Sequence, residues 1–183
     1  MRRALFHGKH RQARCVGGFA INAPDLASAL ERKGQAVHLF TRLVRLDQPW
    51  YEKVHGVQYH RGPYSPSHDF IEDVNNMCRS FVNAFYSTED YAGRFDIVHA
   101  HDWLASNAVV WIKQGRGHKT ILTIHSTEYG RCGNNFYGGN SARVRDHERH
   151  GTFCADKVMA VSQALKGEIM WMYNLPDWKV SVV

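Results

Sequence analysis

Short apolar runs alternate with helical segments along most of this chain, and that alternation restricts the possible folds more than any other feature. The runs that read as buried strands lie at residues 37–40, 95–100, 120–124, 157–161 and 179–183. The segments that read as helices lie at residues 24–33, 69–86, 104–114, 141–153 and 163–173. Helices that separate short, continuously apolar strands predict an α/β fold, a Rossmann-like parallel sheet with helices on both faces.

Residues 43–68 interrupt the alternation. The residues that break regular structure there are Pro49, Gly56, Gly62, Pro63 and Pro66. We therefore expect an irregular excursion with at most one short strand, at residues 57–60. The whole chain has 183 residues, a length that one domain commonly reaches.

Charge and hydropathy bear on the classes of function that remain open. The formal net charge is +6, but the lysines and arginines are scattered and form no run of five or more. Such scatter is typical of a solvated surface, so we expect no nucleic-acid partner. No stretch reaches the ~18 apolar residues that span a bilayer, so we expect no integral membrane segment.

The four cysteines lie far apart and form no C-x-x-C pair. They are Cys15, Cys78, Cys132 and Cys154. Because nothing else in the sequence indicates secretion, we expect four free thiols and a cytoplasmic protein.

Polar residues follow the predicted strands where each strand ends. His101 and Asp102 follow the strand at residues 95–100, and His125 follows the strand at residues 120–124, with Glu128 and Arg131 close behind. The carboxyl ends of parallel strands meet at one edge of a sheet, where ligands collect. The sequence therefore predicts a candidate site at this edge.

Three segments around the predicted strand ends read FDIVHAHDWLA from residue 95, TIHSTEYGR from residue 123 and ADKVMAVSQALKGEI from residue 155. Together they resemble the group 1 glycosyltransferases, in particular their glycogen-synthase-like branch. The stretch VGGFA from residue 16, with the helix and strand after it, resembles the family's first glycine turn. The resemblance covers roughly residues 16–183.

The resemblance implies a GT-B enzyme, in which the active site lies between two Rossmann-like domains. Residues 1–183 would form the N-terminal, acceptor-side domain, and the C-terminal donor-nucleotide domain would be absent. The full enzyme would transfer a sugar, expected to be glucose, from a UDP- or ADP-sugar to a glycan or other acceptor with retention. It would use no cofactor and no metal, and the 183 residues alone would be inactive.

The resemblance also implies roles for particular residues. Gly17 and Gly18 correspond to the turn that approaches the donor's phosphates, where glycine permits close approach of the backbone. His125 corresponds to the histidine beside the transferred sugar, where an imidazole can hydrogen-bond a sugar hydroxyl as positive charge develops. His101 and Asp102 are expected either to contact the acceptor or to shape the loop. The same two roles are open for Glu128 and Arg131, which could pair with each other.

The chain departs from the family pattern near its start. Residues 1–15 are atypical, because at most residues 3–6 read as the first strand. Pro24 also falls inside the family's first helix, where it would remove a backbone donor unless it lies in the first turn.

Two other functions remain open at this stage. A metal-dependent hydrolase could use His99, His101 and Asp102 together with His125, although we expect His99 and His101 to point to opposite faces of the sheet, with His99 packed in the core. His147 and His150, three residues apart on a predicted helix, could also touch one metal, but a solvated polar helix explains them as well. The third possibility is a non-catalytic binding module or the decayed remnant of an enzyme.

Overall fold

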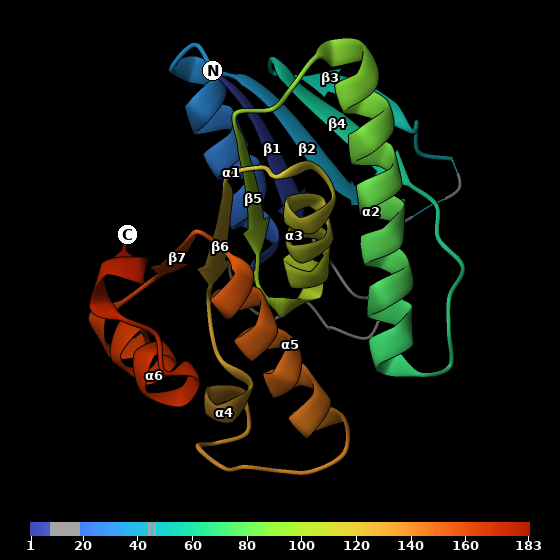
Figure 1. The fold of residues 1–183 in the computed structure, drawn as a ribbon. Helices are drawn as coiled ribbons and strands as arrows, with labels where there is room; N and C mark the ends of the chain where they lie inside the picture. Colours follow the sequence, from blue (N-terminus) through green and yellow to red (C-terminus); the bar gives the residue numbers. More distant parts are fainter. Residues whose placement is uncertain (8–18, 44, 46) are drawn as a thin grey trace.

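The computed structural model describes residues 1–7, 19–43, 45 and 47–183. These residues form an eight-stranded sheet with the strand order β3-β4-β2-β1-β5-β6-β7-β8 (Figure 1). The strands are β1 (Arg2–His7), β2 (Ala36–Arg42), β3 (Tyr51–Val54), β4 (Val57–Gly62), β5 (Ile97–His101), β6 (Thr120–Ile124), β7 (Lys157–Ala160) and β8 (Val180–Val182). Neighbouring strands pair in parallel, except that β3 and β4 are antiparallel.

Helices cover both faces of this sheet (Figure 1). They are α1 (Phe19–Arg32), α2 (Phe70–Ala92), α3 (Trp103–Arg116), α4 (Glu128–Arg131), α5 (Asn140–Cys154) and α6 (Gln163–Tyr173), with a short 3-10 helix at Asp177–Lys179. Helix α1 packs on β1, β2 and β4, whereas α2 and α3 pack on the opposite face. The predicted α/β fold, a Rossmann-like sheet between helices, is confirmed.

The alternation of side chains along β1 shows how the two faces are filled. Ala4 and Phe6 belong to the larger core cluster under α2 and α3, and Leu5 belongs to the smaller cluster under α1. All three are fully buried. The Phe6 ring stacks on that of Phe40 in β2, with ring centroids 5.0 Å apart. Because β1 is central and buried on both faces, it holds the two layers of helices together.

The first strand is therefore formed, although the sequence made it doubtful. Strand β1 extends one residue beyond residues 3–6 at each end. Its two arginines lie at the amino end of the strand, outside the apolar core. The Arg2 backbone N–H donates there to the Asp96 carboxylate at 2.6 Å. Residues 8–15 of the atypical segment lie outside the described residues.

The excursion at residues 43–68 contains two strands rather than one. Strands β3 and β4 form a hairpin whose turn residues, His55 and Gly56, have φ angles of 46° and 82°. Positive φ at both central residues is typical of a tight two-residue hairpin turn. The sequence did not indicate β3, because it lies at the sheet edge and its side chains Tyr51 and Lys53 are exposed.

Pro24 lies inside α1, as the resemblance suggested. The helix begins at Phe19, so Pro24 falls beyond the first turn. A proline at that position cannot donate its backbone hydrogen bond, and the helix continues to Arg32 without it.

Candidate active site

The candidate site is built around His125, the residue that follows β6 directly. Its backbone N–H donates to Asp102 Oδ1 at 2.9 Å. Its Nε2 lies 3.0 Å from Nδ1 of His101, and the two rings are nearly parallel with centroids 5.3 Å apart. The end of β5 therefore fixes both the backbone and the ring of His125.

Asp102 occupies an unusual backbone conformation at the turn between β5 and α3. Its φ angle is 59° and its ψ angle is 175°, values that side-chain-bearing residues rarely adopt. Its backbone N–H donates to the Thr123 carbonyl at 2.7 Å, and the residue is only 4% exposed. Such strain persists where surrounding contacts enforce it, and it is common at functional sites.

Burial sets the charge state of these groups. It raises the pKa of the Asp102 carboxyl to about 7, although the backbone N–H of His125 opposes that shift. Burial, with smaller contributions from His99 and His125, lowers the pKa of His101 to about 2. Burial also lowers the pKa of His125. Both imidazoles are thus neutral at pH 7. Because a neutral imidazole has one donor and one acceptor nitrogen, their shared hydrogen bond couples the tautomers of the two rings.

The expectation that His99 and His101 point to opposite faces is wrong. Their rings stack with centroids 4.7 Å apart and an interplanar angle of 21°. Residues two apart on a strand share a face, since side chains alternate from one residue to the next. The expected core position of His99 does hold, because it is 4% exposed and its Nε2 lies 2.7 Å from the Thr123 hydroxyl.

The loop after His125 folds into the short helix α4. Arg131 Nε lies 3.1 Å from Glu128 Oε2, and Arg131 Nη1 donates to the Ser126 carbonyl at 2.7 Å. Glu128 and Arg131 therefore pair with each other and tie the loop together. Contact of either residue with an acceptor stays a prediction.

Glu148 in α5 is a residue of this site that sequence reasoning missed. Its fully buried carboxylate accepts the backbone N–H of Glu128 at 2.9 and 3.0 Å. It also accepts hydrogen bonds from Arg131 Nη2 and from the Tyr173 hydroxyl of α6. Burial raises the pKa of Glu148, and Arg131 opposes that shift. One carboxylate thus joins α4, α5 and α6, and nothing in the polar sequence of α5 marks it out.

The remaining sequence-predicted residues are not brought to this cluster. Gly17 and Gly18 lie outside the described residues. His147 contacts Asn107 at 3.1 Å and His150 lies beside Cys154, so these two histidines have separate partners. Within the described part of the chain, no three His, Cys, Asp or Glu side chains group so that they could hold a metal ion. The described cysteines, Cys78, Cys132 and Cys154, are free thiols.

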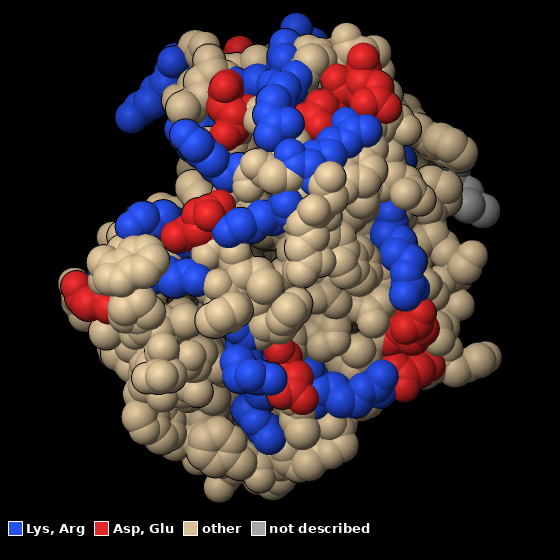
Figure 2. Space-filling model, viewed as in Figure 1, with Lys and Arg blue, Asp and Glu red and all other residues tan. Residues whose placement is uncertain are grey.

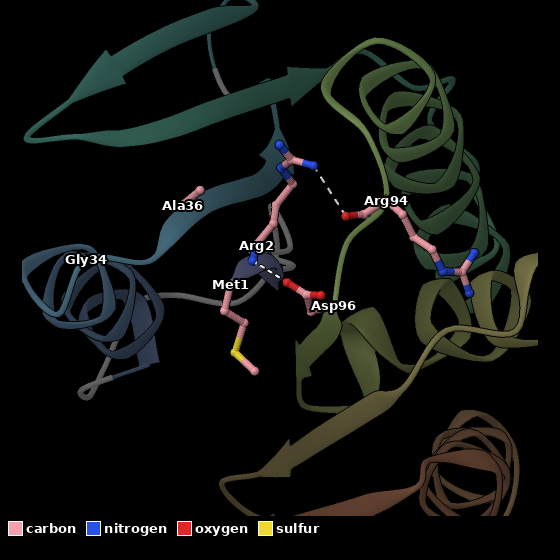
Figure 3. A pocket seen from close by; sticks show the side chains of 6 residues that line it. All are labelled: Met1, Arg2, Gly34, Ala36, Arg94 and Asp96. Atoms are coloured by element: carbon pink, nitrogen blue, oxygen red, sulfur yellow. Dashed lines mark hydrogen bonds between the residues drawn. The ribbon is translucent and has the colours of Figure 1, made fainter.

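A cavity of about 400 Å³ lies at the opposite edge of the sheet (Figure 3). It is lined by Met1, Arg2, Gly34, Ala36, Arg94 and Asp96, at the amino ends of β1, β2 and β5. Ligands of parallel sheets bind at the carboxyl ends of strands, so this cavity is distinct from the candidate site.

The surface charges are mixed. Figure 2 shows lysines and arginines interspersed with acidic residues on the face drawn, with no continuous basic patch there. None of the described helices is both long enough and apolar enough to span a membrane.

Comparison with known proteins adds to this picture. A model of the family described as Glycosyltransferase Family 4 matches residues 16–183. An uncharacterized glycosyltransferase of Methanocaldococcus jannaschii is 33% identical over 171 residues, covering 93% of this chain and 42% of the relative. A glycogen synthase of Mycobacterium tuberculosis is 31% identical, covering 92% and 44%.

Solved structures share the fold. The sucrose-phosphate synthase of Thermosynechococcus elongatus superposes with a TM-score of 0.77 at 20% identity, covering all of this chain and 47% of that one. The catalytic domain of starch synthase IV from Arabidopsis thaliana, bound to ADP and acarbose, gives a TM-score of 0.64 at 16% identity, covering all of this chain and half of that one. The chain spans at most about half the length of each of these four proteins.

Proposed function

The chain belongs to glycosyltransferase family 4, and from that membership we propose that its residues form the acceptor-side half of a sugar-transferring active site. The fold is that of a GT-B N-terminal domain. In the whole enzyme, a second Rossmann-like domain would hold a nucleotide-sugar, and the acceptor would lie against the edge that carries His125.

The proposed reaction is transfer of a hexose, most simply glucose, from UDP- or ADP-sugar to a glycan or other acceptor, with retention at the anomeric carbon. The similarity to proteins named glycogen synthase and starch synthase supports glucose as the sugar. ADP bound to the starch synthase structure supports a nucleotide donor. We place the reaction in the cytoplasm, with no cofactor and no resident metal.

The observation that carries the proposal is the way His125 is held. Its ring is neutral, half-buried and fixed by His101, while its backbone is fixed by the buried Asp102 carboxylate. A polar group fixed in advance stabilises developing charge without having to reorganise during the reaction. His125 is therefore suited to hydrogen-bond a hydroxyl of the transferred sugar while positive charge builds at the anomeric carbon.

The other residues have supporting roles in this proposal. His101 and Asp102 position His125, since both are buried and directed at it rather than at solvent. Glu128 and Arg131, with Glu148, order the loop that would lie against the acceptor. Gly17 and Gly18 keep their proposed role beside the donor phosphates.

A fusion enzyme tests the proposal. The 183 residues are joined to the C-terminal remainder of the Methanocaldococcus jannaschii relative, and the fusion is assayed with UDP- and ADP-glucose and glucan acceptors. We expect release of the nucleoside diphosphate and an α-linked product by proton NMR. The 183 residues assayed alone should transfer no sugar, because a GT-B site lies between two domains. A folded fusion that binds donor yet transfers no sugar to any acceptor tried, or a β-linked product, would contradict the proposal.

A further inference from the structure

Three buried side-chain nitrogens lack a hydrogen-bond partner in the described part of the chain. They are Nε and Nη1 of Arg42 and Nε2 of His101. Arg42 is the last residue of β2 and His101 is the last residue of β5. All three unpartnered atoms therefore lie at the carboxyl edge of the sheet, the edge where ligands collect.

Arg42 is the more unusual of the two residues. It is 3% exposed, and a guanidinium stays protonated at every pH a protein tolerates. Burial of a charge without a partner opposes folding strongly, so buried arginines are normally paired. The chain itself follows that rule at Arg61, whose side chain is 13% exposed and which binds Glu52 at 2.7 Å.

We infer that Arg42 binds a phosphate group of a substrate. Each of the two forked edges of a planar guanidinium includes one of the unpartnered nitrogens, so an anion at either edge meets an unused donor. A neutral acceptor such as a hydroxyl would satisfy the nitrogens but leave the charge unbalanced. Phosphate satisfies both requirements, and arginine binds it with paired, charge-assisted hydrogen bonds.

Arg42 lies at the same carboxyl edge of the sheet as the candidate active site. His7, at the end of β1, pairs with Thr41 on one side and with His101 on the other. Arg42 follows Thr41, so it lies on the opposite face of the sheet from His101, two strand spacings away, or about 10 Å between backbones. A ligand that reached both residues would have to lie across the ends of the strands. This inference rests on the proposed function for the identity of the ligand. The phosphate could belong to the nucleotide-sugar donor or to a phosphorylated acceptor.

Thermal unfolding of the 183-residue chain in inorganic phosphate, at constant ionic strength, tests the inference without any transfer reaction. Arg42→Met is compared with the wild type and with Arg45→Met, a matched control because Arg45 is exposed and pairs with Asp47. At ten times its Kd, phosphate should raise Tm by about 3–5 °C in the wild type and in Arg45→Met. Phosphate should leave the Tm of Arg42→Met unchanged. Any general strengthening of hydrophobic burial by phosphate is common to the three proteins and cancels when they are compared.

The same experiment has outcomes that overturn the inference. Without phosphate, Arg42→Met should melt at the wild-type temperature or above it, because the substitution removes a buried charge, two of whose nitrogens have no hydrogen-bond partner among the described residues. A lower Tm, or failure to fold, would show that the guanidinium already has a partner within the protein. An equal phosphate response in all three proteins would also overturn it.

Organic phosphates identify the source. A response to UDP or ADP that depends on Arg42 assigns the phosphate to the donor, and a response to glucose 6-phosphate assigns it to the acceptor. A response to inorganic phosphate with neither of these would mean an adventitious ion only, and the inference would be wrong. Because none of these measurements requires turnover, the inference and the proposed function can fail separately.

Discussion

At the scale of single residues, Asp102 combines a positive φ angle, near-complete burial and a carboxyl pKa of about 7. Each of these properties is unfavourable for folding by itself. The residue is nevertheless placed so that its side chain accepts the backbone N–H of His125. The carboxyl group accepts this hydrogen bond while shielded from water. We regard Asp102 as a positioning residue: it lowers the stability of the fold, but it fixes the position of His125 in the site.

The raised pKa of Asp102 predicts a pH-dependent stability. Between its ordinary pKa of 3.8 and its folded pKa of about 7, the folded state holds a proton that the unfolded state releases. The stability contribution of this group is therefore fully present below pH 3.8 and is lost as the pH rises through about 7. Asp102→Asn cannot lose a proton, so relative to the wild type it should gain about 2–4 kcal/mol of unfolding free energy between pH 4 and pH 8.

Urea denaturation of both proteins across that range measures the effect. The lowered pKa values of His99 and His101 make stability depend on pH in the direction opposite to that of Asp102. The stability that these two neutral histidines contribute is lost as the pH falls below 6.5. Comparing the two proteins at each pH removes this common background. A difference in unfolding free energy that does not change with pH would refute the raised pKa.

The sequence predicted well which residues would come together at the site. It predicted less well which contacts they would make with one another. Strand ends alone indicated His101, Asp102 and His125, because the edge of a parallel sheet gathers them. The stacking of His99 on His101 was missed through a wrong assignment of faces, which the spacing of two residues should have prevented. Burial of Asp102 could not be predicted, because it depends on how the loop after β6 closes over the strand end.

At the scale of elements, the loop between β6 and α5 is organised by Glu148. This carboxylate accepts hydrogen bonds from the start of α4 and from residues of α4 and α6. The contact that joins α4, α5 and α6 is therefore a polar one, centred on the Glu148 carboxylate. We expect this junction to determine how firmly the acceptor side of the site is held.

Glu148→Gln should test that junction. The substitution keeps the size of the side chain but removes the charge that Arg131 meets, so we expect a loss of about 2–3 kcal/mol of unfolding free energy. Glu72→Gln is the matched control, because Glu72 pairs with Arg79 on the exposed surface, where ion pairs contribute ~0–1 kcal/mol. If both variants lose the same stability in urea, Glu148 is not the organising residue.

Elements with a strong apolar pattern were predicted closely, and elements defined by tertiary contacts were not. Strand β6 and helix α6 have the predicted bounds, because each has clear apolar residues and α6 has its cap at Ser162, whose hydroxyl accepts the Leu165 N–H at 3.1 Å. Strand β3 and helix α4 were missed. The first is an exposed edge strand, and the second has four residues, too few to show a helical period.

At the scale of the whole molecule, the sheet carries the candidate site at one edge and a separate cavity at the other. Helices on both faces bury the central strands, so the site lies on a rigid support. The family membership and the fold agree on the N-terminal domain of a GT-B glycosyltransferase.

We predict that a chelator will not inhibit the fusion enzyme. The nitrogens of His101 and His125 that face each other, 3.0 Å apart, share a hydrogen bond, and the described residues gather no other set of metal ligands. Turnover measured in EDTA should therefore equal turnover in buffer alone. Loss of activity that added divalent metal restores would contradict this prediction and would revive a metal-dependent reading of the site.

The most direct test of the account is the effect of His125→Ala on the fusion enzyme. His150→Ala serves as the control, because it removes an exposed imidazole from α5. If His125 stabilises the transition state, kcat should fall by ~10²–10³-fold. Donor Kd should change by less than about threefold, because the contact strengthens only as charge develops. Values of kcat per folded molecule within about threefold of the wild type, together with a lowered Tm, would show that His125 only orders the loop, and the proposed catalytic role would be wrong.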